Sequence, residues 1–133
     1  MKIGLWIDLT FTRRFYESSR LADRDIKYVK LECRGHGETP TPDQTSAFIR
    51  ICSQFISQNP LASVGVHCTH GFNRTGFLII SYLVEREDWS LDRAVVEFSR
   101  CRPPGIYKQV IDSPVFLFRY DFLNMAFERN YFL

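Results

Sequence analysis

A strand-like run that leads directly into a helix constrains the fold of this chain more than any other feature. Residues 63–67 form a short apolar run typical of a buried strand, and a glycine-containing turn separates them from an apolar helical pattern over residues 75–87. Two similar runs, at residues 3–9 and 28–33, are also expected to be strands. Alternating strands and helices predict an α/β fold in which helices flank a mainly parallel, twisted sheet.

Two further helices are predicted from their first residues and their apolar stripes. Thr41 can cap a helix whose first turn contains Pro42, and Gln44 can complete a capping box. That helix is expected to end near residue 59, and its apolar face is formed by Ala47, Phe48, Ile51 and Phe55. Ser90 is expected to cap the second helix, which stops at the Arg-Pro-Pro-Gly segment of residues 102–105. The apolar stripe of this second helix comprises Leu91, Ala94, Val95 and Phe98.

Cys68 and Arg74 stand at the two ends of the turn between residues 63–67 and the helix that follows. In such a turn, backbone N–H groups point into one concavity, and the dipole of the helix adds positive potential there. A free thiol has a pKa of about 8.5, which a helix N-terminus and an arginine lower, so Cys68 is expected to be a nucleophilic thiolate. Arg74 can hold two phosphate oxygens with its planar guanidinium group. The intervening residues, which are expected to bind phosphate together with Arg74, are Thr69, His70, Gly71, Phe72 and Asn73.

Thr75 adds a third chemical group, because its hydroxyl can donate to the Cys68 sulfur and help it leave when water attacks a phosphocysteine. Cys68, Arg74 and Thr75 therefore predict a cysteine-dependent phosphatase that requires neither a metal ion nor another cofactor. The alternative is an inert core thiol at Cys68, which the neighbouring glycines, arginine and threonines do not favour. His67 is expected to bond backbone groups and orient the turn, whereas His70 either lines the pocket or faces water.

The other cysteines and the charge exclude several classes of protein. The four cysteines show no paired spacing, so together with three histidines they indicate neither a zinc site nor a disulfide framework. Cys33, Cys52 and Cys101 are interpreted as packing residues. A net charge of +2 does not by itself indicate nucleic-acid binding. No apolar run approaches the roughly 18 residues of a membrane span, so no membrane partner is expected.

The segment from His67 to Gly76, His-Cys-Thr-His-Gly-Phe-Asn-Arg-Thr-Gly, resembles the cysteine-phosphatase RNA 5′-triphosphatase branch of the dual-specificity phosphatase superfamily. It is most similar to the N-terminal domains of metazoan mRNA capping enzymes. Three further segments carry the same resemblance: residues 7–10 with 14–16, residues 27–38, and residues 102–108. The Arg-Pro-Pro-Gly-Ile-Tyr-Lys sequence of the last segment separates the capping-enzyme type from related stand-alone RNA phosphatases.

The resemblance implies removal of the γ-phosphate from the 5′ end of nascent mRNA, the first step of capping. It assigns Cys68 as nucleophile and Arg74 as phosphate ligand, and it matches Asp8 to a family carboxylate that supports activity. Candidate substrate contacts are Arg102, Lys108 and His36. The implied partners are 5′-triphosphate RNA and, through a full-length capping enzyme, RNA polymerase II, and the implied location is the nucleus.

The loop after the second expected strand supports a phosphoanhydride substrate. Phosphatases that act on phosphoserine or phosphotyrosine need an acid to protonate a poor leaving group, and residues 34–40 contain no aspartate. A β-phosphate is a weaker base and leaves with less proton assistance. His36 and Glu38 remain candidate donors. Two alternatives stay open: a dual-specificity protein tyrosine/serine phosphatase, and an inactive phosphate-binding fragment.

The resemblance places a phosphatase domain at residues 1–108 and leaves residues 109–133 as a divergent, aromatic-rich tail. The family has a further segment before its first strand, and this chain begins directly at that strand. The fold is therefore expected to be truncated at its N-terminus and less stable than a complete family domain, with apolar surface exposed near residues 3–9 and near the tail.

Overall fold

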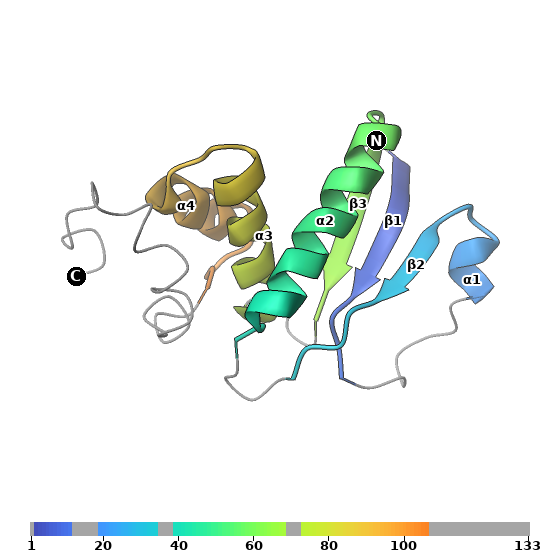
Figure 1. The fold of residues 1–133 in the computed structure, drawn as a ribbon, viewed down its shortest axis with the longest axis horizontal. Coiled ribbons are helices and arrows are strands. Elements are labelled where there is room, and N and C mark those ends of the chain that lie inside the picture. Colours follow the sequence, from blue (N-terminus) through green and yellow to red (C-terminus); the bar gives the residue numbers. More distant parts are fainter. Residues whose placement is uncertain (1, 12–18, 35–38, 69–72, 107–133) are drawn as a thin grey trace.

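The computed structural model describes residues 2–11, 19–34, 39–68 and 73–106 of the 133-residue chain (Figure 1). The aromatic-rich tail at 109–133 lies outside the described residues. The elements follow the order β1 (Lys2–Asp8), α1 (Ser19–Ala22), β2 (Lys27–Lys30), α2 (Pro42–Gln58), β3 (Ala62–His67), α3 (Asn73–Arg86) and α4 (Leu91–Cys101). The alternation of strands and helices that the sequence predicts is confirmed. None of the described helices is long and apolar enough to cross a membrane.

The described strands form one parallel sheet in the order β2-β1-β3, with β1 in the middle. Ile7 of β1 is in register with Val29 of β2 and with Val66 of β3. Figure 1 shows the three strands running in the same direction, with α2 lying along the sheet. Because parallel strands end at a common edge, the residues that follow β1, β2 and β3 meet there, which is where α/β sheets bind ligands.

The two faces of the sheet have different chemistry, as the alternation of side chains along a strand requires. Leu5 and Ile7 of β1 are fully buried and belong to the hydrophobic core. Trp6 alternates with them and lies over Gly65 of β3, where an added Cβ would come within 2.3 Å of the indole ring. Gly65 is therefore required for this contact, and Asp8 occupies the same face as Trp6.

Helix α2 begins as the sequence predicts. The Thr41 hydroxyl accepts from the Gln44 backbone N–H at 3.1 Å, and the Gln44 side chain accepts from the Thr41 backbone N–H at 2.8 Å. The buried face differs from the predicted stripe: Ala47 and Ile51 are only partly buried, and the buried residues are Thr45, Phe48, Ile49, Cys52 and Phe55. The reason is that α2 packs against α3 as well as against β3, so its buried face is turned partly toward α3.

Helix α4 packs on α3 through Phe98, whose ring would lie 2.8 Å from a Cβ added at Gly76. Leu91, Ala94 and Phe98 are buried as predicted, and Val95 packs against the core while partly exposed. The predicted side-chain cap at Ser90 is wrong. Ser90 occupies the N-cap position, but its hydroxyl donates to Asp92 Oδ1 at 2.6 Å and does not cap the helix. The helix ends at Cys101, as the sequence predicts.

Candidate active site

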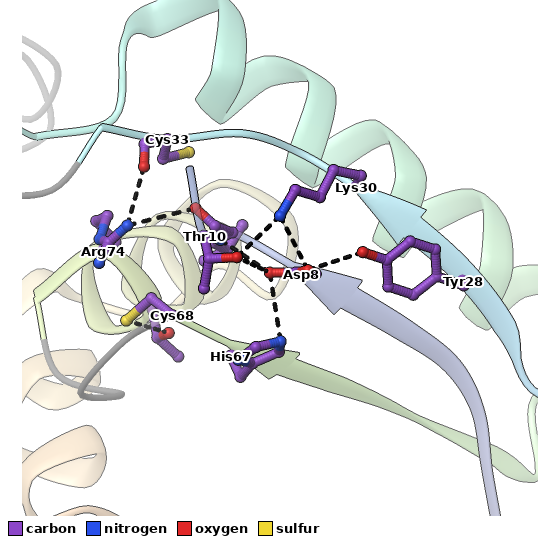
Figure 2. Close-up of polar contacts among 10 residues, drawn as sticks. Asp8, Thr10, Tyr28, Lys30, Cys33, His67, Cys68 and Arg74 are labelled. Carbon is purple, nitrogen blue, oxygen red and sulfur yellow. Dashed lines mark hydrogen bonds and ion pairs between the residues drawn. The ribbon is translucent and has the colours of Figure 1, made fainter. Parts of the chain in front are cut away.

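The candidate site lies where the carboxyl ends of the three strands meet the first turn of α3 (Figure 2). Cys68 directly follows β3, and Arg74 lies in the first turn of α3. Asp8 ends β1, and Lys30 ends β2. The parallel topology thus brings together residues that are separated by up to 66 positions in the chain, from Asp8 to Arg74.

Cys68 is buried, and its sulfur accepts a hydrogen bond from the Thr75 hydroxyl at 3.1 Å. The sequence predicts this contact as a hydroxyl donation from Thr75 to the sulfur. Helix α3 begins at Asn73, and the Thr75 contact places the Cys68 sulfur beside the first turn of this helix. The pair can therefore act as nucleophile and hydroxyl donor at a point of positive helix-dipole potential.

The Arg74 side chain is held by two backbone carbonyls. Its Nη1 donates to Cys33 O at 2.9 Å and to Leu9 O at 3.5 Å, and the residue is only 9% exposed. These carbonyls belong to segments that are themselves connected, because Cys33 N donates to Leu9 O at 3.1 Å and Leu9 N to His67 O at 2.8 Å. The backbone beyond the strands therefore fixes one edge of the guanidinium group before any anion binds.

Asp8 is the centre of a polar network on the face of the sheet that also carries Trp6. Its Oδ1 accepts from the backbone N–H of Thr10 at 2.9 Å and from the Thr10 hydroxyl at 2.6 Å. Its Oδ2 accepts from the Tyr28 hydroxyl at 2.7 Å and from Lys30 Nζ at 3.0 Å, and Lys30 also donates to the Thr10 hydroxyl at 2.8 Å. Figure 2 shows these side chains converging on the Asp8 carboxylate from β2 and from the segment that follows β1.

His67 joins the same network, since its Nε2 lies 3.3 Å from Asp8 Oδ1. Its ring centroid is 5.6 Å from that of Trp6. The sequence predicts backbone bonding for His67 and does not predict the opposing carboxylate. The residue that precedes Cys68 is thus connected to the ends of β1 and β2 through Asp8.

The network keeps Asp8 ionised. Burial of the side chain acts to raise its pKa, but hydrogen bonds from Thr10, Tyr28 and Lys30 outweigh that effect and lower the pKa from 3.8 to about 2. A carboxylate with such a pKa is a poor proton donor near neutral pH. Asp8 is therefore suited to hold positive and hydroxyl groups in place, and not to protonate a leaving group.

We expect Asp8→Asn to lower the free energy of unfolding by about 2 kcal/mol at pH 7. The folded-state pKa lies below the ordinary value, so the ionised carboxylate stabilises the fold above about pH 4 and loses this effect as pH falls toward about 2. Urea unfolding of both proteins between pH 7 and pH 3 measures the difference, which is expected to narrow below pH 4.

Asp25→Asn is the matched control, because the Asp25 side chain is 94% exposed and pairs only at the surface with Lys2. This variant is expected to unfold like the original protein at every pH. An Asp8→Asn difference that is absent at pH 7, or that does not change with pH, would contradict the role assigned to the network.

Other residues that the sequence singles out are placed as follows. Arg102, at the end of α4, borders the same hollow of about 600 Å³ as Cys68 and Thr75, and the remaining lining is mainly apolar, including Trp89 and Phe98. Asn73 is the first residue of α3 and is partly buried. His36, Lys108 and Thr69 to Phe72 lie outside the described residues. The substrate contact expected of Arg102 stays a prediction.

The remaining cysteines divide into two kinds. Cys33 and Cys52 are buried, and burial raises the pKa of Cys33 to about 11 and that of Cys52 to about 12, so both are inert packing thiols as predicted. The interpretation of Cys101 as a packing residue is wrong, because it is exposed at the last turn of α4 and contacts Glu97. Among the residues that the structure describes, no three histidine, cysteine or acidic side chains come together as metal ligands.

Sequence reasoning did not identify Thr10, Tyr28 and Lys30 as parts of the site. A signal for them exists in the alternation of side chains. Tyr28 and Lys30 are two residues apart and therefore share a face of β2, which is the face that Asp8 occupies in the neighbouring strand. If the two strands are assumed to be parallel, the rule that every second side chain points to the same face of a sheet would have identified Tyr28 and Lys30 as neighbours of Asp8.

Comparison with known proteins gives one family match and several relatives. The family described as "Dual specificity phosphatase, catalytic domain" matches residues 1–110. The chain is 58% identical over 108 residues to the mRNA-capping enzyme of Danio rerio, covering 81% of this chain and 18% of that protein. It is 41% identical over 103 residues to the RNA/RNP complex-1-interacting phosphatase homolog of Caenorhabditis elegans, covering 76% of this chain and 44% of that protein. The chain thus spans less than a fifth of the capping enzyme it matches.

Solved structures agree with the fold. The crystal structure of PTPMT1 superposes with a TM-score of 0.72 at 15% identity, covering 93% of this chain and 81% of that one. The crystal structure of human DUSP28 gives a TM-score of 0.71 at 11% identity, covering 93% and 80%. At these identities the likeness concerns the fold alone, and it confirms the predicted parallel sheet flanked by helices.

Proposed function

The chain belongs to the dual specificity phosphatase catalytic-domain family, and from this premise we propose that it removes the γ-phosphate from 5′-triphosphate RNA. The observation that carries the proposal is the 58% identity to an mRNA-capping enzyme over 108 residues. By the same argument, the chain acts in the nucleus, and RNA polymerase II is a partner of the full-length protein to which such a domain belongs.

In the proposed reaction the Cys68 sulfur attacks the γ-phosphorus, and the bond between that phosphorus and the bridging oxygen breaks. The RNA leaves with a diphosphate end, and the phosphoryl group remains on sulfur. Arg74 binds the equatorial oxygens, where negative charge is held in the transition state. Water then attacks the phosphocysteine, inorganic phosphate is released, and the Thr75 hydroxyl stabilises the departing thiolate through its 3.1 Å contact.

The acidity of the carboxyl groups supports an anhydride substrate. Asp8, the acidic residue at the strand ends, has a pKa of about 2. Glu97 borders the hollow that contains Cys68, and hydrogen bonding from Arg100 lowers its pKa as well. Neither group is suited to protonate an alkoxide or phenoxide, whereas a diphosphate leaving group needs less assistance.

The proposed substrate class is tested by comparing kcat/KM for a short 5′-triphosphate RNA with kcat/KM for phosphotyrosine and phosphoserine peptides. We expect the RNA to be strongly preferred. A preference for either peptide would favour a dual-specificity protein phosphatase, and phosphate binding without turnover of any of the three would identify an inactive module.

We also predict that EDTA leaves the triphosphatase rate unchanged. A thiolate supplies the nucleophile and a guanidinium group supplies charge neutralisation, which are two of the tasks that a metal ion performs in metal-dependent hydrolases. The rate is measured with and without chelator, and then after addition of Mg²⁺ or Mn²⁺. Loss of activity on chelation with recovery on adding Mn²⁺ would show that the cysteine mechanism is wrong.

A further inference from the structure

Phe11 and Arg34 form an exposed pair beside the phosphate site. Phe11 is 59% exposed, and the guanidinium carbon of Arg34 lies 5.8 Å from the centroid of the Phe11 ring. A single exposed apolar residue is ordinary in a soluble protein. Here the exposed aromatic ring is combined with a cation, and both side chains leave the backbone at the edge of the sheet where the candidate nucleophile lies.

The position of the pair follows from the anchors of Arg74. Leu9 O and Cys33 O both accept from Arg74 Nη1, at 3.5 Å and 2.9 Å. Arg34 is the next residue after Cys33, and Phe11 is two residues after Leu9, a span of at most about 7 Å. The pair therefore follows closely on the two backbone anchors of Arg74, in the segments that continue from the neighbouring strands β1 and β2.

The backbone that carries Phe11 is held in place. Thr10, which precedes it, is 1% exposed, and both its N–H and its hydroxyl donate to Asp8 Oδ1. Lys30 donates to the Thr10 hydroxyl at 2.8 Å. Figure 2 shows Thr10 and Cys33 near Arg74, and Phe11 and Arg34 are the residues that follow them in the chain. A ring on such a fixed segment loses little freedom when a planar ligand covers it.

We propose that Phe11 and Arg34 form a stacking platform for the first nucleobase of 5′-triphosphate RNA, an inference that rests on the proposed function. With the γ-phosphate at Cys68 and Arg74, the β- and α-phosphates and the ribose lead outward, so the base falls at the rim of the site. An exposed aromatic ring next to a guanidinium group is the chemistry that binds unpaired bases. Stacking accepts every base, because each has a π-face, so all four 5′ nucleotides are expected to be processed.

The test separates base binding from phosphate binding. KM and kcat are measured for a short 5′-triphosphate RNA, together with the inhibition constant of inorganic tripolyphosphate, which has the phosphates but no base. Phe11→Ala is expected to raise KM for the RNA about tenfold, as loss of one base–aromatic stack does, and to leave the inhibition constant of tripolyphosphate unchanged. Phe11→Trp keeps a stacking surface and is expected to retain KM within about twofold.

Leu61→Ala is the matched control, because Leu61 is 87% exposed and precedes β3 at the opposite end of the sheet. It is expected to change neither constant. An unchanged KM for RNA in Phe11→Ala would overturn the platform while leaving the proposed function intact. Equal weakening of RNA and tripolyphosphate would overturn it too, because Phe11 would then shape the phosphate site. Failure of the unaltered protein to release γ-phosphate from RNA would overturn the proposed function and the platform together.

Discussion

Cys68→Ser is expected to abolish γ-phosphate release while phosphate binding persists. A serine hydroxyl stays protonated in this setting and is a poor nucleophile, whereas the helix N-terminus, Arg74 and the Thr75 hydroxyl are untouched. The expected fall in kcat is at least about 10⁴-fold, the scale on which enzymes lose rate when a covalent nucleophile is removed. Phosphate release from labelled triphosphate RNA measures the rate. Calorimetric titration of the variant with inorganic phosphate or tungstate measures binding.

Cys101→Ser controls for the general effect of removing a thiol. Cys101 is exposed on α4 and takes no part in the proposed reaction, so this variant is expected to retain the full rate. Substantial hydrolysis by Cys68→Ser would contradict a covalent mechanism. Loss of phosphate binding in the same variant would show that the substitution had disrupted the site instead of the chemistry.

Arg74→Lys is expected to be nearly as damaging as Arg74→Ala. Lysine keeps the charge but loses the planar fork, so it cannot donate to Cys33 O and Leu9 O on one side while spanning two phosphate oxygens on the other. Loss of one transition-state donor of this kind costs roughly 10²–10³-fold in kcat. The rates of both variants on triphosphate RNA, at saturating substrate, measure the effect.

Arg100→Lys provides the comparison, because Arg100 is exposed on α4 and pairs with Glu97 at the surface. Its rate is expected to stay near that of the original protein. Because Arg74 is buried, urea unfolding of the Arg74 variants must show that they are folded at the assay temperature. A folded Arg74→Lys protein with near-normal rate would mean that Arg74 supplies only positive potential and not geometry.

The elements with local signals could be predicted from the sequence. The capping box at Thr41 and Gln44 is contained within four residues, and the Thr75 hydroxyl bonds a sulfur only seven positions away in the chain, so neighbouring residues suffice to define both contacts. The second strand is shorter than predicted, ending at Lys30 and not at residue 33. Backbone hydrogen bonds between the two segments continue beyond the strands. Leu31 N donates to Asp8 O and Cys33 N donates to Leu9 O, although β1 itself ends at Asp8.

The parts of the site that the sequence did not predict depend on the packing of distant segments. The acceptors of Arg74 are backbone carbonyls 65 and 41 residues away, and a carbonyl has no sequence signature. Lys30 and His67 reach Asp8 only because β1 lies between β2 and β3. Cys101 shows the converse error: its residue type suggests burial, whereas its place at the end of α4 exposes it.

The phosphate state of the RNA 5′ end after metal-free incubation tests the central claim most directly. A short triphosphate RNA labelled at both the α- and γ-phosphates is incubated with the protein in EDTA, with Cys68→Ser in parallel. The account predicts an α-labelled diphosphate end, all of the γ-label as inorganic phosphate, and no change with the serine variant. A triphosphate end that remains intact, a monophosphate end, or equal conversion by Cys68→Ser would contradict it.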